Sequence, residues 1–195
     1  MTLRAVLALG FALASVGVRA ADGPGKTVDG AQSAPITTKN WSTHPTIVAI
    51  RSLVADVDAA IESGKWNRKT HEECESKSGS FYAEERTAIR DESGHVRKYV
   101  GELGGDDSAY TMKHWYDAEG RLRFAYGTAG AIGDPESGGH SYIRYRLYFA
   151  EDGQLVWQDR QVEGPFRPSM DGFQNRMLVR EPEKVLATKL VCPEG

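Results

Sequence analysis

The apolar residues that follow Pro45 recur at intervals of three and four, the spacing that places side chains on one helix face. Ser42 or Thr43 offers a capping hydroxyl, and Pro45 is tolerated in a first helical turn. Gly64 ends the pattern. The polar side of the helix is acidic, which favours packing on a sheet over lying on a membrane or a partner. The residues of the apolar stripe are Ile47, Ile50, Val54, Val57 and Ile61.

From Ser78 onward, apolar and polar residues alternate with a period of two, which is typical of strands. Acidic residues followed by glycine recur at 91–94, 117–120 and 151–153, a combination that favours type I turns with a glycine bulge. The short connections favour an antiparallel meander whose apolar face is covered by the helix. The predicted fold class is therefore α+β, with about six strands near 80–90, 95–103, 109–117, 122–128, 141–150 and 154–162.

The fifth predicted strand has two chemically different faces. Its apolar face, which should lie against the helix, carries Ile143, Tyr145, Leu147 and Phe149. Its other face carries tyrosine and arginine, which are favoured at binding interfaces. The loop predicted before this strand, Gly127 to His140, is longer than an ordinary hairpin loop, and such loops often carry function. The predicted binding residues are His140, Tyr142, Arg144, Arg146 and Tyr148, and ordinary solvent-side cross-strand pairing is the alternative.

The chain after the sixth predicted strand reads as an irregular tail. Gly164 and two prolines cannot continue a central strand. A short strand is predicted at 177–179. A short helix is predicted at 181–189, with Pro182 in a tolerated first-turn position.

The N-terminus has the composition of a secretory signal peptide, residues 1–20, cleaved between Ala20 and Ala21. Residues 21–41 are predicted to be a flexible leader, and 42–195 a single α+β domain. Cleavage removes Arg4 and Arg19, so 22 basic and 27 acidic residues remain, a net charge of −5. An acidic chain with interspersed signs lacks the basic surface that nucleic acid requires. We expect a soluble periplasmic or secreted protein with no nucleic-acid partner and no membrane insertion after cleavage.

The chain has two cysteines, and in an oxidising compartment an even pair is most simply a disulfide. A Cys74–Cys192 bond would tie the region after the helix to the C-terminus and stabilise the fold by about 2–4 kcal/mol. A catalytic role for Cys74 is the alternative, because His71 lies nearby. The acidic neighbours of Cys74 would raise its thiol pKa, which disfavours that alternative.

The sequence carries no recognisable cofactor or metal motif, so none is predicted. Gly127, Gly130 and Gly133 lack the Gly-Lys-Ser/Thr ending of a phosphate loop, and His71-Glu72 lacks the second histidine of a zinc-protease helix. No two histidines have the spacing of metal ligands on one helix, and a metal site assembled across strands is the alternative. A hydrolase whose site is assembled across strands, using His114 or His140, stays open.

Two segments share an aromatic pair, an acidic turn, glycine and leucine: residues 114–122, HWYDAEGRL, and 147–155, LYFAEDGQL. They resemble the hairpin repeats of MORN-type bacterial proteins. The resemblance implies an interaction role or an antitoxin-like role. With no catalytic set in view, the leading expectation is an exported, soluble binding module of the cell envelope, in its narrower form an inhibitor or immunity protein. An envelope hydrolase is the alternative, and a passive envelope protein comes third.

Overall fold

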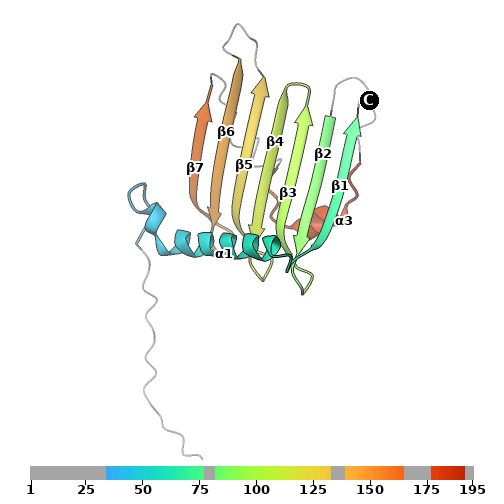
Figure 1. Cartoon of the computed structure of the whole chain (residues 1–195). Helices are drawn as coiled ribbons and strands as arrows, with labels where there is room; N and C mark the ends of the chain where they lie inside the picture. The colour runs from blue at the N-terminus through green and yellow to red at the C-terminus, as the bar shows by residue number, and fades with distance from the viewer. Residues whose placement is uncertain (1–33, 77–81, 133–138, 165–176, 192–195) are drawn as a thin grey trace, which may run out of the picture. The chain divides into compact units, whose positions relative to one another are not determined.

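The computed structural model describes residues 34–76, 82–132, 139–164 and 177–191. Seven strands form one antiparallel sheet in sequence order, with a long helix against it (Figure 1), which confirms the α+β prediction. The strands are β1 (Arg68–Ser76), β2 (Tyr82–Arg90), β3 (Val96–Gly105), β4 (Ser108–Tyr116), β5 (Leu122–Ile132), β6 (His140–Phe149) and β7 (Leu155–Glu163).

The three predicted hairpin turns are present, between β2 and β3, β4 and β5, and β6 and β7. In each turn the glycine has a positive φ, between 77° and 88°, which suits a residue without a Cβ. In the first turn the Gly94 N–H donates to the Asp91 carbonyl at 3.0 Å, and the Asp91 carboxylate accepts the His95 N–H at 3.0 Å. A local hydrogen bond therefore fixes the turn where the sequence places an acid and a glycine.

The first strand of the sheet, β1, was not predicted. Its sequence, RKTHEECES, has no alternation of apolar residues, and Cys74 is its single buried residue. As the sheet's first strand, β1 has a hydrogen-bonded neighbour only in β2. Such an edge strand does not need the apolar pattern on which the strand predictions rest.

The strand β5, which corresponds to the fourth predicted strand, is longer than predicted and includes part of the expected loop. Residues 127–132 continue β5, and Gly127 and Gly130 pair with Tyr145 and Tyr142 of β6. A Cβ on Gly130 would lie 3.8 Å from the Tyr142 ring. Small residues on β5 thus lie beside large rings on β6. The rest of the predicted loop, 133–138, lies outside the described residues.

The helix α1 (Pro45–Glu62) follows a 3-10 turn, η1 (Trp41–Thr43). Its N-cap is His44, whose Nδ1 accepts the Thr46 N–H at 3.2 Å, so the predicted cap at Ser42 or Thr43 is wrong. The His44 Nε2 lies 2.7 Å from the Ala34 carbonyl oxygen, which holds residue 34 against the start of the helix. The described end of the predicted leader, from residue 34, is therefore part of the packed unit.

The helix α1 runs across the strands near one end of the sheet (Figure 1). Ile47, Ile50 and Val57 are buried, in agreement with the predicted stripe. They pack in one cluster with aromatic residues of three strands, and Trp41, Ile36 and Trp157 flank this cluster. The aromatic residues at its centre are Trp115, Phe124 and Tyr148.

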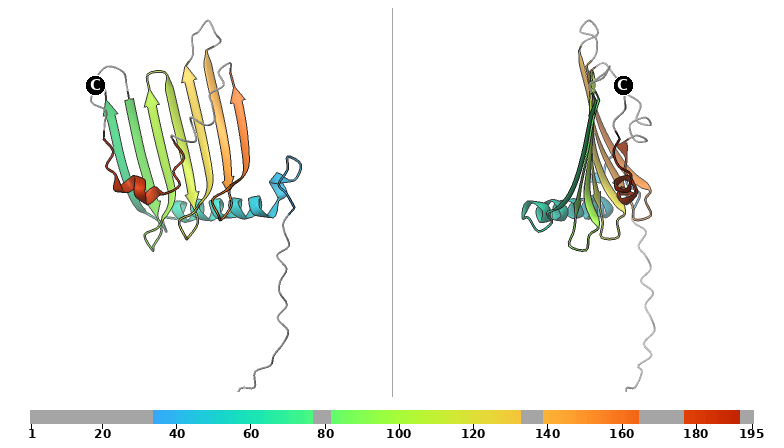
Figure 2. Two further views of the ribbon diagram at one scale, coloured as in Figure 1. Left: turned by 180° about the vertical axis from the view of Figure 1, so that it is seen from behind. Right: turned by 90° about the vertical axis from the view of Figure 1, so that its right-hand side faces the viewer.

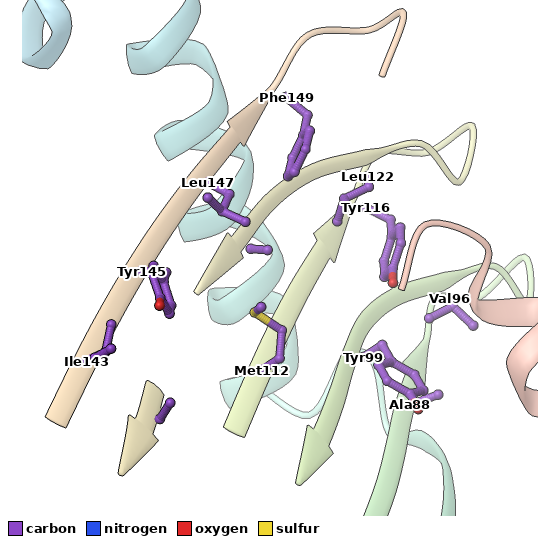
Figure 3. Packing of buried hydrophobic residues seen from close by; sticks show 12 residues of the cluster. Ala88, Val96, Tyr99, Met112, Tyr116, Leu122, Ile143, Tyr145, Leu147 and Phe149 are labelled. Atoms are coloured by element: carbon purple, nitrogen blue, oxygen red, sulfur yellow. The ribbon is translucent and has the colours of Figure 1, made fainter. Parts of the chain in front are cut away.

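The apolar face of β6 lies on the side of the sheet opposite α1, which corrects the prediction that it faces the helix. Ile143, Tyr145 and Leu147 belong to a second cluster, which packs against residues 177–186 (Figure 3). Edge-on, α1 and α3 (Pro182–Ala187) lie on opposite sides of the sheet (Figure 2). The prediction failed because both faces of β4 to β6 carry aromatic residues, so alternation alone could not decide which face meets α1.

The C-terminal segment follows the prediction in part. The helix α3 begins at Pro182 as expected, but it spans six residues and ends at Ala187. Residues 177–179 form no strand. Among the described residues, none of the helices has the length and apolar character required to cross a bilayer.

Candidate functional site

The predicted binding residues share one side of the sheet. The β5–β6 register pairs Tyr148 with Phe124 and Arg146 with Tyr126, and Phe124 and Tyr148 pack in the α1 cluster. Because side chains alternate along a strand, the even-numbered residues of β6 all point to this side. We call the set His140, Tyr142, Arg144, Arg146 and Tyr148, with its β5 and β7 neighbours, the Tyr/Arg face.

Both arginines of the face are held by ion pairs across the strands. An Arg146 Nη1–H donates to Asp159 Oδ2 at 2.8 Å, and an Arg144 Nη2 lies 3.7 Å from Glu163 Oε1. The guanidinium of Arg144 lies 5.1 Å from the Tyr142 ring centre. Because the two arginine side chains remain 40% and 37% exposed, each offers further N–H donors to a ligand.

A cleft of about 330 Å³ lies where the Tyr/Arg face meets α1, and we call it the α1 cleft. It combines two guanidinium groups with aromatic and apolar walls. The Arg51 guanidinium lies 4.9 Å from the Trp41 ring centre and 6.0 Å from that of Tyr148, within cation–π range. Its Nη1–H donates to the Ser42 carbonyl at 3.1 Å. The lining residues are Trp41, Arg51, Val54, Phe124, Arg146 and Tyr148.

One wall of the α1 cleft is braced by a pair of tryptophans. Trp41 stacks on Trp157 with ring centres 5.6 Å apart and planes 14° apart. The Trp157 indole N–H is buried, and it has no hydrogen-bond partner among the residues described. A buried donor without a partner costs about 1–3 kcal/mol.

Trp41 and Arg51 were not predicted as site residues. Trp41 lies at the end of the predicted leader, and Arg51 lies off the apolar stripe of α1, so each read as solvent-facing. Trp41 and Arg51 lie close to Arg146 and Tyr148 because of the direction in which α1 crosses β5 and β6. A helical periodicity gives the buried side of a helix but not this direction.

A second hollow, of about 370 Å³, lies at the other end of β6, and we call it the rim hollow. His140, Ser141 and Tyr142 line it together with two acidic residues, Asp106 and Asp107. These acidic residues are far from β6 in the sequence. Ser141 is buried and His140 is exposed. The Tyr/Arg face therefore ends in a hollow at each end of β6.

A third hollow, of about 240 Å³, lies beneath the C-terminal segment. Here Glu84 accepts hydrogen bonds from Arg86 Nε, at 2.9 Å, and from the Tyr82 hydroxyl. Burial, reinforced by that bond to Glu84, raises the pKa of Tyr82 to about 12, and burial raises the pKa of Tyr99 to about 12. Both phenols stay protonated at neutral pH, so neither can act there as a base.

His114, one of the two histidines considered for catalysis, is completely buried. Its Nε2 accepts the Val179 N–H at 3.0 Å, and its Nδ1 lies 3.4 Å from the Tyr99 carbonyl oxygen. Burial lowers the pKa of His114 to about 4, so the ring is neutral at physiological pH. In this arrangement His114 holds the C-terminal segment and has no access to a substrate.

Within the described ranges, no three His, Cys, Asp or Glu residues are placed to hold a metal ion. The other predicted site, the Cys74–Cys192 bond, involves a residue outside those ranges. Cys74 is buried on the side of β1 that faces the C-terminal segment.

No protein family, curated protein or solved structure matches this chain.

Proposed function

We propose that this protein is an exported binding module of the cell envelope, and that the Tyr/Arg face contacts a protein partner. The observation that carries the proposal is the composition of this face. Tyr142, Arg144 and Arg146 lie side by side on β6, and a cleft containing Trp41 and Arg51 lies where this face meets α1, over the buried Tyr148. Tryptophan, tyrosine and arginine are the residues that most often dominate binding energy at protein interfaces.

The partner surface that fits this face is acidic. Arg144 and Arg146 each pair with one carboxylate of β7, while Arg51 donates a hydrogen bond to the Ser42 carbonyl. A partner carboxylate placed over the face would meet guanidinium groups that are half exposed and already oriented by their ion pairs. Such charge complementarity promotes fast and specific association, as an inhibitor or immunity protein requires.

Export and the disulfide belong to the same proposal. In the β1–β2 register, Arg86 lies opposite Glu72, and its Nη1–H donates to the Thr188 carbonyl oxygen at 3.4 Å. Cys74 is two residues from Glu72 on the same side of β1, and Cys192 is four residues beyond Thr188. A bond between the two cysteines is therefore within reach of the chain, and it would form in the oxidising periplasm.

Capture from an envelope extract tests the proposal. The wild-type protein should retain one stoichiometric partner, and the Arg144→Ala/Arg146→Ala variant should retain at least about tenfold less of it. An Arg180→Ala/Lys184→Ala variant is the matched control, because both residues belong to the C-terminal segment on the other side of the sheet. Equal capture by the wild type and the arginine variant of β6 would refute the proposal.

The rim hollow supports a second candidate function, an envelope hydrolase. It gathers His140 and the acidic pair Asp106–Asp107 around one space, whereas Ser141 is buried and its side chain points to the opposite side of β6. A histidine beside carboxylates can act as a general base toward a water molecule. This candidate predicts a hydrolytic activity on small envelope esters or amides that His140→Ala abolishes and His95→Ala, at an exposed turn, leaves intact.

A further inference from the structure

We infer that the α1 cleft is a subsite for a carboxylate carried next to an aromatic group. The inference deepens the proposed function and rests on it, because it names the chemistry of the ligand at one end of the Tyr/Arg face. It follows from the charges lining the cleft, from its aromatic walls and from its size.

The charges come first. In the part of the chain that the structure describes, the charged residues lining the cleft are Arg51 and Arg146, and no acidic residue lines it. Asp159 pairs with Arg146 from β7, outside the lining, so one of the two guanidinium groups has a carboxylate beside it. Among the described residues, the two aspartates of α1, Asp56 and Asp58, form no ion pair with Arg51. Asp56 is exposed, and Asp58 accepts hydrogen bonds from Lys98 and Trp115. An anion entering the cleft would restore the charge balance.

The walls specify what accompanies the anion. Trp41 presents a partly exposed ring, and the buried Phe124 and Tyr148, whose ring centres lie 4.8 Å apart, close the cleft beneath it. Arg51 lies over two of these rings, which orients its guanidinium plane. A ligand ring placed among them would gain apolar burial and aromatic contacts, while its carboxylate would reach an arginine.

The volume of the cleft limits the size of the ligand that it can hold. A space of about 330 Å³ is at the small end of ligand sites and holds one ring with its carboxylate, not a long peptide. Two sources supply this chemistry: a free aromatic acid, or the C-terminal residue of a partner chain when that residue is aromatic. The shared group is an aromatic ring two or three bonds from a carboxylate.

The test is a titration of the purified protein with 3-phenylpropionate, followed by tryptophan fluorescence, since Trp41 lines the cleft and Trp157 stacks on it. We expect a dissociation constant on the order of 1 mM, as suits a ligand this small. The neutral analogue 3-phenylpropionamide should bind about tenfold more weakly. The Arg51→Gln and Arg146→Gln variants should each lose about tenfold in affinity for the acid.

The matched control is Arg180→Gln, which removes an arginine that also lies over an aromatic ring, that of Phe149, but outside the cleft. Its affinity for the acid should equal that of the wild type. The inference would be overturned if the acid and the amide bound equally well, or if all three variants lost the same affinity for the acid. It would also be overturned if the acid did not bind at about 20 mM, which is 20-fold above the expected dissociation constant.

Two peptide probes distinguish the sources. Acetyl-Gly-Gly-Phe with a free terminal carboxylate is compared with its C-terminal amide. Tighter binding of the peptide acid than of 3-phenylpropionate supports a chain end, and weaker binding supports a free acid. If the acids fail to bind while partner capture still depends on Arg144 and Arg146, this inference fails alone. If both fail, the proposed function fails with it.

Discussion

His114 and Val179 join the sheet to the C-terminal segment through a hydrogen bond in which the buried imidazole is the acceptor. The Val179 N–H donates to His114 Nε2 at 3.0 Å, and the Tyr116 hydroxyl donates to the Val179 carbonyl at 2.8 Å. Both backbone groups of Val179 are therefore held by side chains of β4. Because Nε2 accepts, the ring proton lies on Nδ1, and a second proton on Nε2 would break the bond.

This arrangement predicts a loss of stability in mild acid. The unfolded chain binds a proton at His114 near its usual pKa of 6.5, whereas burial lowers the folded pKa to about 4. Stability is therefore complete above pH 6.5 and falls by about 1.4 kcal/mol per pH unit as the pH drops toward 4. Urea denaturation should give about 2 kcal/mol less unfolding free energy at pH 5 than at pH 7.

The matched control for this pH effect is His114→Gln, in which the slope between pH 5 and 7 should disappear. The hydrogen bond from Arg90 lowers the pKa of Glu183, so the contribution of that carboxylate is present above pH 4.5 and is lost only below it. An unchanged slope in the variant would show that another group carries the pH dependence.

Tyr116→Phe should loosen the C-terminal segment without disturbing the core. The change removes the hydrogen bond to the Val179 carbonyl and keeps the ring, so we expect a loss of about 1–1.5 kcal/mol. Hydrogen exchange is the sensitive measurement. The Val179 amide should exchange about tenfold faster in the variant, while amides in the centre of β5 should not change. Equal acceleration in both places would mean that the bond stabilises the whole domain.

Of the glycines in the described ranges, Gly164 is the one that the structure tolerates least as alanine. Its φ is +90°, and a Cβ there would lie 2.4 Å from the His140 carbonyl oxygen. Gly164→Ala should cost about 3 kcal/mol or more, because a backbone clash is added to the strain of positive φ. Gly120→Ala is the control, with φ +77° and open space at the Cβ, and should cost about 1 kcal/mol. Thermal unfolding of the two variants measures the difference, and similar melting temperatures would contradict it.

Asp58 attaches α1 to the sheet. Its Oδ1 accepts hydrogen bonds from Lys98 Nζ at 2.7 Å and from Trp115 Nε1 at 2.9 Å. Asp58→Ala should destabilise the domain by about 2 kcal/mol, since it leaves the indole N–H without its partner. Asp56→Ala, two residues away and exposed, should change stability by less than about 0.5 kcal/mol. The midpoints of chemical denaturation would test both values.

The sequence was most informative where local chemistry determines structure. The acid–glycine turns, the six strands from β2 to β7 and the stripe on α1 all follow from short-range patterns, and the structure confirms them. The edge strand β1 escaped because it buries little. The side of the sheet chosen by α1 depends on long-range packing between two faces that both carry rings, so alternation on β6 could not reveal it.

In the candidate site, too, the sequence revealed what one strand determines and missed what long-range contacts determine. The strand pattern identified Arg146 and Tyr148, because one strand is enough to define a face. Trp41 and Arg51 became neighbours of these residues only through the crossing of α1 over β6, and the rim hollow formed only when the β3–β4 turn met the start of β6. Contacts of this kind join segments far apart in sequence, and no single stretch of the chain records them.

A photo-crosslinking experiment tests the central claim most directly, because β7 offers two exposed glutamines on opposite sides of the sheet. Gln161 pairs with Arg144 and lies on the Tyr/Arg face, whereas Gln158 pairs with Leu147 and lies on the other side. A photoreactive benzophenone amino acid is placed at either position, and intact cells are irradiated. The account predicts one strong crosslinked partner from position 161 and none from 158. Crosslinking from 158 alone, or the same product from both positions, would contradict it.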